Sequence, residues 1–141
     1  MVVPARLTTT LTIPAFDFDE DEYATADRPS TYFPPDGKLV LIIGDDVLNL
    51  SVGRRIVLGR KSKDSSPLVV DLTHFASYQL GVSRNHAAIE HVDGDHLELS
   101  DLASVNGTFL NGKRLIARVG YGLHDGDEIR LSELIIRVRF E

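Results

Sequence analysis

The sequence predicts an all-β fold, an antiparallel β-sandwich that follows a flexible acidic tail. Three observations favour this fold. Short runs of apolar residues alternate with polar ones at a period of two, turn-forming glycine, aspartate and asparagine separate these runs, and no stretch has apolar residues at helical spacing. The 141 residues, of which 43% are hydrophobic, suffice for one domain with its own core but not for two large ones.

The first 36 residues differ from the rest in composition and charge. Residues 1–36 hold seven acidic residues, including the run Asp17–Glu22, against Arg6 and Arg28, whereas residues 37–141 hold fourteen acidic and thirteen basic residues. The few apolar positions of this segment are interrupted by prolines and threonines and cannot build a core alone. We therefore interpret residues 1–36 as a flexible acidic tail and residues 37–141 as the folded domain.

The domain begins with an apolar run, Leu39–Ile43, which ends at the turn residues Gly44-Asp45-Asp46, as a buried strand does. Alternation of apolar and polar residues then returns several times. The apolar positions are Leu48, Leu50 and Val52, then Leu97 and Leu99, then Ile129 and Leu131, and finally Ile136, Val138 and Phe140 with Arg137 and Arg139 between them. Each segment predicts a half-buried strand.

The strongest local signal is Asn111-Gly112, which separates the segments 108–110 and 113–115. Asparagine and glycine can both adopt the positive φ that a type I′ turn requires. The pair therefore predicts a two-residue β-hairpin.

Composition argues against several classes of function. Of the formal charge of −6, residues 1–36 hold −5 and the domain only −1, so the domain lacks the basic field that binds nucleic acid. Without cysteine, no disulfide or thiolate metal site is possible. No apolar run approaches about 18 residues and the start lacks the pattern of a secretory signal, so we expect neither a membrane span nor export, and a cytoplasmic location.

Three short groups of residues stand at the ends of strand-like runs, where loops present side chains to a ligand. They are Gly59-Arg60, Ser83-Arg84-Asn85-His86 and Asn106-Gly107-Thr108. A guanidinium donates two parallel hydrogen bonds to phosphate oxygens, a serine hydroxyl adds a third, and an asparagine amide can grip a peptide backbone. These side chains together indicate a reader of phosphorylated peptides.

In this order and spacing, followed by Leu110-Asn111-Gly112, the groups resemble the signature of the forkhead-associated (FHA) domain over residues 38–141. The resemblance implies a sandwich of about eleven strands, FHA/SMAD-like, whose loops at one end bind phosphothreonine in an extended peptide without catalysis or cofactor. It implies a non-catalytic adaptor in Ser/Thr kinase signalling. The expected partner is a phosphothreonine-containing protein, not nucleic acid, a membrane or a small molecule.

The resemblance also assigns roles within the site. Arg60 is the phosphate anchor, Ser83 and Arg84 add hydrogen bonds to the phosphate, and Asn106 clamps the peptide backbone. Val105 departs from the family, in which a polar residue is common here, so it has only its backbone N–H to give. The residues expected to support the site are Gly59, Gly107, Thr108, Asn111, Gly112 and His86, whose ring is expected to lie inward beneath the Ser83 segment.

Some alternatives stay open. A surface ion pair is the structural alternative for Arg60, and a turn hydroxyl is the structural alternative for Ser83. The long connection from Lys61 to Val82 also departs from the family, and ligand selectivity beyond the phosphothreonine could reside in it.

Two other classes of function are possible for the whole domain. A sandwich face could bind unmodified partners independently of phosphorylation. A metal-dependent enzyme would use His86, His91 and His96, but their spacing puts neighbours on opposite faces of a strand, and no acidic partner stands at ligand spacing. Hydrolysis through Ser83 lacks the Gly-x-Ser-x-Gly elbow. We therefore expect no metal and no catalytic residue.

The tail suggests regulation of the domain. A phosphorylated threonine of the tail could fold back into the phosphate site, because tethering raises its effective concentration to about the millimolar scale. The candidate phosphosites are Thr8, Thr9, Thr10, Thr12, Thr25 and Thr31. The acidic run Asp17–Glu22 could occupy the same site without modification.

Overall fold

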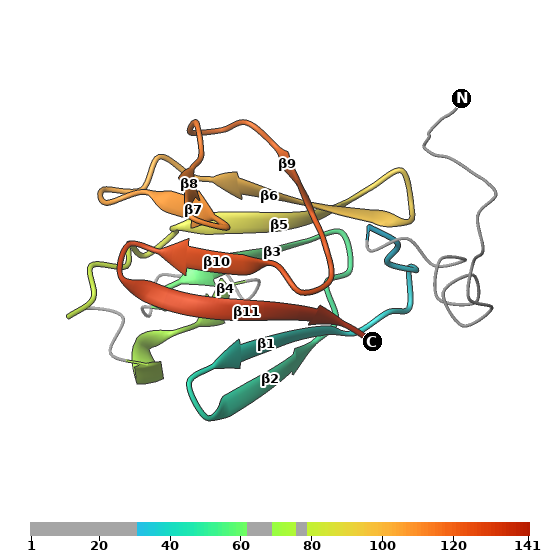
Figure 1. Cartoon of the computed structure of the whole chain (residues 1–141), viewed down its shortest axis with the longest axis horizontal. Coiled ribbons are helices and arrows are strands. Elements are labelled where there is room, and N and C mark those ends of the chain that lie inside the picture. Colours follow the sequence, from blue (N-terminus) through green and yellow to red (C-terminus); the bar gives the residue numbers. More distant parts are fainter. Residues whose placement is uncertain (1–30, 62–68, 76–78) are drawn as a thin grey trace, which may run out of the picture.

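Eleven strands form two facing sheets in the computed structural model, which describes residues 31–61, 69–75 and 79–141 (Figure 1). The six-stranded sheet has the order β2 (Asp46–Leu50), β1 (Leu39–Ile43), β11 (Leu134–Phe140), β10 (Glu128–Leu131), β7 (Thr108–Leu110) and β8 (Lys113–Arg114). The five-stranded sheet has the order β4 (Val69–Asp71), β3 (Arg55–Gly59), β5 (Ala87–Val92), β6 (His96–Asp101) and β9 (Tyr121–Leu123). The predicted all-β sandwich and its strand number are confirmed.

Neighbouring strands run antiparallel throughout both sheets, with one exception. β3 and β4 pair in parallel, with Val57 opposite Val69. The only helical element in the described ranges is a 3₁₀ turn, η1 (Thr73–Phe75). Among these residues, no helix is long and apolar enough to cross a membrane.

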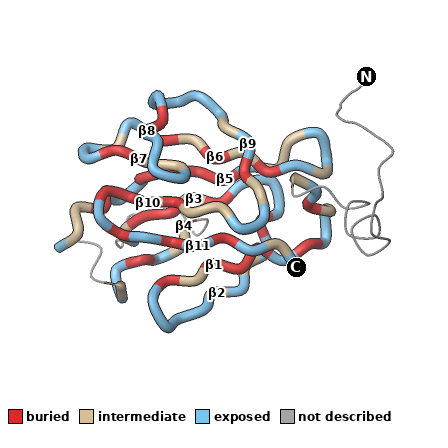
Figure 2. The backbone as a smooth tube through the Cα atoms, in the orientation of Figure 1, coloured by how far each residue is buried: buried red, intermediate tan, exposed pale blue. Residues whose placement is uncertain are grey.

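The inner faces of the two sheets enclose a continuous hydrophobic core (Figure 2). β11 shows how the sequence builds it: Leu134, Ile136 and Val138 are buried, whereas Ile135 and Arg137 between them are exposed. This is the period of two that the sequence predicted, because successive side chains of a strand point to opposite faces. Burying such a Leu, Ile or Val side chain contributes about 1.5–3 kcal/mol. The core contains buried residues from seven of the eleven strands, and partly buried residues of β2, β4 and β7 pack against it.

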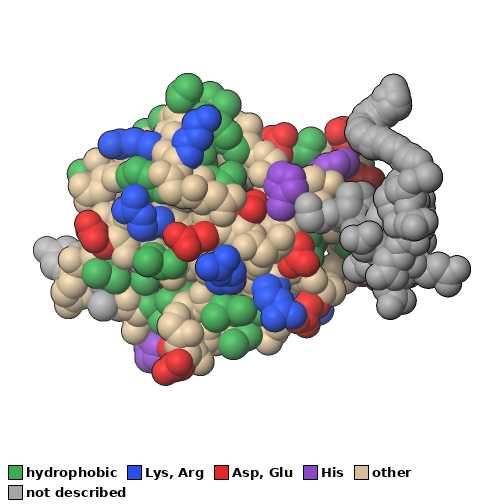
Figure 3. Space-filling view, viewed as in Figure 1, with side chains coloured by type: hydrophobic (Ala, Val, Ile, Leu, Met, Phe, Trp, Pro, Cys, Tyr) green, Lys and Arg blue, Asp and Glu red, His purple; other side chains and the backbone are tan. Residues whose placement is uncertain are grey.

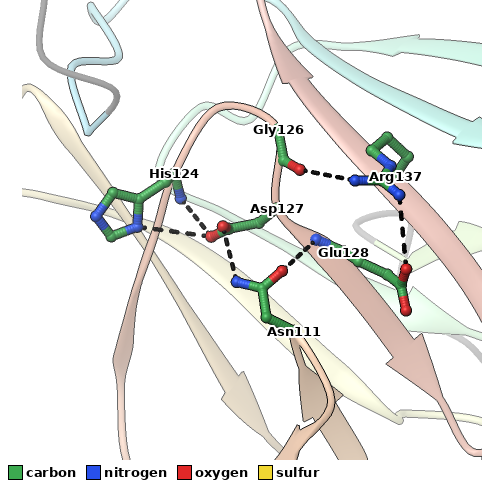
Figure 4. A network of polar contacts seen from close by, with 6 residues as sticks. All are labelled: Asn111, His124, Gly126, Asp127, Glu128 and Arg137. Atoms are coloured by element: carbon green, nitrogen blue, oxygen red, sulfur yellow. Dashed lines mark hydrogen bonds and ion pairs between the residues drawn. The ribbon is translucent and has the colours of Figure 1, made fainter.

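The predicted hairpin is present between β7 and β8. Asn111 has φ 50° and Gly112 has φ 86°, which are the positive values of a type I′ turn. Asn111 also reaches the turn before β10: its Nδ2 donates to Asp127 Oδ1 at 2.9 Å, and its Oδ1 accepts from the Glu128 N–H at 2.9 Å (Figure 4). The Asn111 side chain therefore joins the β7–β8 turn to the connection between β9 and β10, which links the two sheets.

The folded domain starts earlier than residue 37. Phe33 is fully buried in the core, its ring lies 5.0 Å from that of Phe140 and 5.1 Å from that of His91, and its N–H donates to the Asp95 carbonyl at 2.8 Å. The expectation that residues 31–36 belong to the tail is corrected, because a single large aromatic side chain anchors them. The expected flexibility of residues 1–30 lies outside the described residues.

Candidate functional site

Three loops meet at one end of the sandwich, at the left in Figure 1. They follow β3, precede β5 and follow β6, and they converge because Leu58 at the end of β3 and Asp101 at the end of β6 both pair with Ala87 at the start of β5. A shallow depression of about 190 Å³ lies between them, lined by Arg60, Gly81, Val82, Ser83, Val105 and Asn106. Four of the five predicted peptide contacts are thus brought together.

Arg60 is fastened to the loop that carries Ser83. Its backbone N–H donates to the Ser83 carbonyl at 3.3 Å, and its Nε donates to the Val82 carbonyl at 2.6 Å. The side chain is half-buried. The Nε hydrogen bond restricts the orientation of the guanidinium plane, so a permanent positive charge is held at the edge of the depression.

The Ser83 hydroxyl links two of the loops. Its Oγ accepts a hydrogen bond from the Val105 N–H at 3.1 Å, and its O–H remains able to donate. The N–H of Val105, expected to serve the ligand, therefore serves Ser83 in this structure. Val105 is 82% exposed, more than any other large hydrophobic residue of the described ranges, and it places an apolar surface beside the depression.

His86 lies beneath these loops and is completely buried. Its Nδ1 accepts from the Ser83 N–H at 2.9 Å, which leaves the proton on Nε2 for donation to the Gly107 carbonyl at 2.8 Å. Burial lowers the pKa of His86, although the Gly107 carbonyl and the Asp101 charge oppose this. A neutral imidazole with a defined tautomer therefore bridges the loop before β5 and the loop after β6.

Asp101 organises the loop between β6 and β7, and the sequence analysis did not identify it. Its Oδ1 accepts from the hydroxyls of Ser104 (2.6 Å) and Thr108 (2.7 Å), and the Ser104 Oγ accepts in turn from the Gly107 N–H at 2.9 Å. Burial alone would raise the pKa of Asp101, but these hydrogen bonds outweigh it and lower the pKa. The signal that could have found it is a strand-end aspartate followed three residues later by serine, a pairing typical of side-chain-capped turns.

Two glycines permit close approaches at the site. A Cβ on Gly59 would lie 1.8 Å from the Arg84 carbonyl oxygen, so the loop before β5 packs directly on the β3 backbone. Gly107 has φ +93°, and a Cβ there would approach the Arg114 side chain to 2.9 Å. Position 59 requires a glycine because there is no space for a Cβ atom. Position 107 requires one for the same reason and also because its φ is positive.

The remaining predicted residues occupy varied places. Asn106 is exposed, and its Nδ2 donates to the Gly81 carbonyl at 2.9 Å. Arg84 is exposed but does not line the depression, and Thr108 is buried against Asp101. Asn111 and Gly112 form the β7–β8 turn and do not line it either.

The predicted tail phosphosites Thr8, Thr9, Thr10, Thr12 and Thr25 lie outside the described residues, as do residues 62–68 and 76–78 of the long connection. Thr31 lies within the described residues, two positions before Phe33. The Phe33 N–H donates a hydrogen bond to the carbonyl of Asp95, in the turn that follows β5 at its far end. β5 spans six residues, or about 20 Å. Thr31 is therefore held at the opposite end of the sandwich from the depression.

The three histidines of the metal hypothesis do not share one place. His86 lies at the site end of β5, whereas His96 is opposite Val92 at the other end, and His91 Nδ1 is 2.6 Å from the Gly53 carbonyl. Within residues 31–61, 69–75 and 79–141, no three His, Cys, Asp or Glu side chains are grouped so as to hold a metal ion.

Comparison with known proteins gives concordant matches. The sequence profile of the FHA domain matches residues 51–132, more than half of the chain. Protein FraH of Nostoc sp. (strain PCC 7120) is 33% identical over 96 residues, which cover 68% of this chain and 32% of FraH, so the chain spans about a third of that relative.

Two solved structures at 31% identity agree with this match. An FHA domain from a structural and functional analysis of phosphothreonine-dependent FHA domain interactions has a TM-score of 0.55, with 72% of this chain and 95% of that chain covered. The FHA domain of a hypothetical protein of Arabidopsis thaliana has a TM-score of 0.58, with coverage of 79% and 90%.

Proposed function

The chain belongs to the FHA domain family, and from this membership we propose that its three convergent loops bind a phosphothreonine-containing partner protein, so that the chain acts as a non-catalytic adaptor. Because Ser/Thr kinases create phosphothreonine, the adaptor would act in Ser/Thr kinase signalling. A structural relative that was studied for phosphothreonine-dependent interactions supports the proposal.

The observation that carries the proposal is the mutual fixation of Arg60 and Ser83. Two hydrogen bonds from Arg60, one from its N–H and one from its Nε, hold it to the loop of Ser83 and Val82, and both residues line the same depression. A phosphate in this depression would accept from the guanidinium and from the Ser83 hydroxyl. Asn106 at its edge would then pair with the backbone of the peptide, which requires no particular neighbouring side chain.

The direct test is isothermal titration of the full chain with a degenerate phosphothreonine peptide pool and with its unphosphorylated twin. Saturable binding is expected only for the phosphorylated pool. Arg60→Ala should weaken it about 10- to 100-fold, because a hydrogen bond to a charged group is worth about 1.5–3 kcal/mol.

Arg139→Ala provides the matched control, because Arg139 is an exposed arginine on β11 of the other sheet. This variant should bind the pool as the wild type does. Equal binding of the phosphorylated and unphosphorylated pools would reject the proposal and favour a phosphorylation-independent interaction.

We further propose that the tail competes for this site when phosphorylated. Thr25 precedes Thr31 by six residues and reaches at most about 20 Å from it, whereas Thr12 precedes it by nineteen and reaches about 60 Å. Since Thr31 is held at the opposite end of the sandwich, residues 8–12 are the better placed phosphosites. Deleting residues 1–30 should raise the affinity of kinase-treated protein for the peptide pool, and an unchanged affinity would remove this regulation.

A further inference from the structure

A row of three side chains crosses the outer face of the six-stranded sheet. Phe109 of β7 is opposite Arg114 of β8 on one side and opposite Arg130 of β10 on the other. Ile129 and Leu131 are buried in the core, so Arg130, which lies between them, points away from it. We call Arg114, Phe109 and Arg130 the cationic row.

The cationic row is held together by contacts between its guanidinium groups and its aromatic ring. The guanidinium carbon of Arg130 lies 3.9 Å from the centre of the Phe109 ring, and that of Arg114 lies 5.8 Å from it. Arg130 Nη1 also donates to the Ser132 carbonyl at 2.7 Å. Stacking and this hydrogen bond restrict the Arg130 side chain, so a ligand that binds its remaining N–H groups has less side-chain freedom to remove.

No acidic side chain neutralises the cationic row. In the part of the chain that the structure describes, neither Arg114 nor Arg130 forms an ion pair. Glu128 lies on the same face but pairs with Arg137 at 3.6 Å, and Glu133, in the turn after β10, is exposed and joins neither arginine of the row. The cationic row therefore offers two positive charges to an acidic ligand.

Apolar side chains accompany these charges on the same face. Ile135 of β11 is opposite Arg130 and is 53% exposed, and Phe109 itself is only half-buried. This face is turned toward the viewer in Figure 3, where basic, acidic and apolar side chains are exposed together. A ligand that fits this surface should therefore combine carboxylates with apolar or aromatic side chains.

The chain itself contains a segment with this combination. Residues 16–22 begin with alternating phenylalanine and aspartate and end in acidic residues, so that they hold five carboxylates and two phenylalanines. These five are most of the seven acidic residues that precede residue 37. The segment is therefore complementary to the cationic row in charge and in apolar character.

The length of the tail allows this segment to reach the cationic row. The row lies at the end of the sandwich that holds the phosphate depression: Arg130 contacts Ser132, whose Oγ would lie 2.6 Å from a Cβ on Gly81, which lines the depression. Thr31 is held at the other end. Glu22 precedes Thr31 by nine residues and can lie about 30 Å from it, which exceeds the length of about 20 Å that β5 spans between the two ends.

We infer that the cationic row binds residues 16–22 of the same chain. Their carboxylates pair with Arg114 and Arg130, and their phenylalanines pack against Phe109 and Ile135. One exposed ion pair strengthens binding only about two- to fivefold, but tethering gives the segment an effective concentration on the order of millimolar. A contact that is too weak between separate molecules is therefore populated within one chain.

This contact needs no phosphate, so it is separate from the proposed phosphopeptide site. Its consequence for regulation rests on the proposed function. A docked segment 16–22 holds residues 8–12 at the end of the sandwich that contains the phosphate depression. A phosphorylated threonine among them then competes for the depression from a shorter tether, which raises its effective concentration.

The test is paramagnetic relaxation enhancement on the full chain, which has no cysteine and therefore accepts a single spin label at Ala15→Cys. The amide signals of Phe109, Arg114 and Arg130 should lose about half of their intensity, because a millimolar effective concentration populates a weak contact. This loss should disappear at an ionic strength of about 1 M, where the Debye length is about 3 Å.

Matched variants of the tail test the role of its charge. Asp17→Asn, Asp19→Asn and Asp21→Asn together should abolish the loss of intensity, whereas glutamate at the same three positions should retain it, because the charge is kept. Arg114→Gln combined with Arg130→Gln should also abolish it. The tail variants leave the described residues unchanged, so their result does not depend on whether the arginine variant folds.

Several results would overturn the inference. One is an absence of any loss at the three amides, and another is a loss that is the same in wild type and in the asparagine variant. A loss confined to the amides of Ser83 and Val105 would place the acidic segment in the phosphate depression instead. A loss seen only between spin-labelled and isotope-enriched copies would make the contact intermolecular. Because no phosphopeptide is present, none of these results would refute the proposed function, which has its own titration.

Discussion

Substituting Gly59 by alanine should test whether the site depends on direct contact between β3 and the loop before β5. The new Cβ would lie 1.8 Å from the Arg84 carbonyl oxygen and 2.9 Å from that of Ser83. Cβ contacts under 3.0 Å are essentially never seen, so the Arg84 carbonyl must move by about 1.2 Å. The obstacle is backbone rather than the end of a flexible side chain, so no rotamer change relieves it.

The displacement should affect stability and binding to different extents. Overpacking of this kind costs about 1–3 kcal/mol of the free energy of unfolding. Ligand groups must be held to within about 0.5 Å of their productive positions, so a shift of about 1.2 Å in the segment of Ser83 should weaken phosphopeptide binding more than tenfold. We expect a folded Gly59→Ala variant that has nearly lost its affinity.

Denaturant unfolding and isothermal titration with the phosphothreonine pool measure the two effects. Gly122→Ala is the matched control, because Gly122 is also a strand glycine without positive φ and its Cβ would meet only His124 Cε1 at 3.8 Å. The control should change neither quantity beyond about 0.5 kcal/mol. A Gly59→Ala variant as stable and as tightly binding as wild type would refute the contact.

Two further predictions concern His86 and Phe33. Burial lowers the pKa of His86, so as the pH falls the unfolded chain binds a proton at this residue before the folded chain does. The contribution of the neutral His86 to the free energy of unfolding is therefore complete above about pH 6.5, and it is lost as the pH falls from there toward the pKa of the folded state. Denaturant unfolding at several pH values in this range should show that the free energy of unfolding of wild type decreases as the pH falls. The decrease should be smaller in His86→Gln, whose amide does not titrate. The same decrease in both proteins would contradict a neutral His86 that bridges the two loops. Phe33→Ala should lower the free energy of unfolding by about 3–5 kcal/mol, because a fully buried ring is removed. Val47→Ala, at a 55% exposed position, should have little effect, and equal melting temperatures for the two variants would show that Phe33 does not anchor residues 31–36.

Local patterns in the sequence were sufficient for much of the fold. The alternation in β11 follows from which face is buried, and the Asn111-Gly112 turn follows from backbone conformations that few residue pairs can adopt. The position of Phe33 was missed because one aromatic residue among prolines has no periodicity, and its burial depends on contacts with Phe140 and His91 far along the chain.

The site was predictable to a lesser degree. Short motifs located Arg60, Ser83 and Asn106, which lie around one depression. Asp101 was not identified, because its contacts with Ser104 and Thr108 arise only when the loop after β6 folds back on the end of that strand. The hydrogen bond from the Val105 N–H to the Ser83 hydroxyl was equally unpredictable, because it depends on how the loop before β5 packs against the loop after β6 and not on the sequence of either loop alone.

The hydrogen bonds among the loops form an unbroken series from Val105 through Ser83 and His86 to Gly107. A recognition surface assembled in this way does not have to become ordered when a ligand arrives. Its association rate should then rise in proportion to ligand concentration, with no plateau from a slow rearrangement, and differences among ligands should be expressed in how long each complex lasts. Exchange of partners would be governed by dissociation.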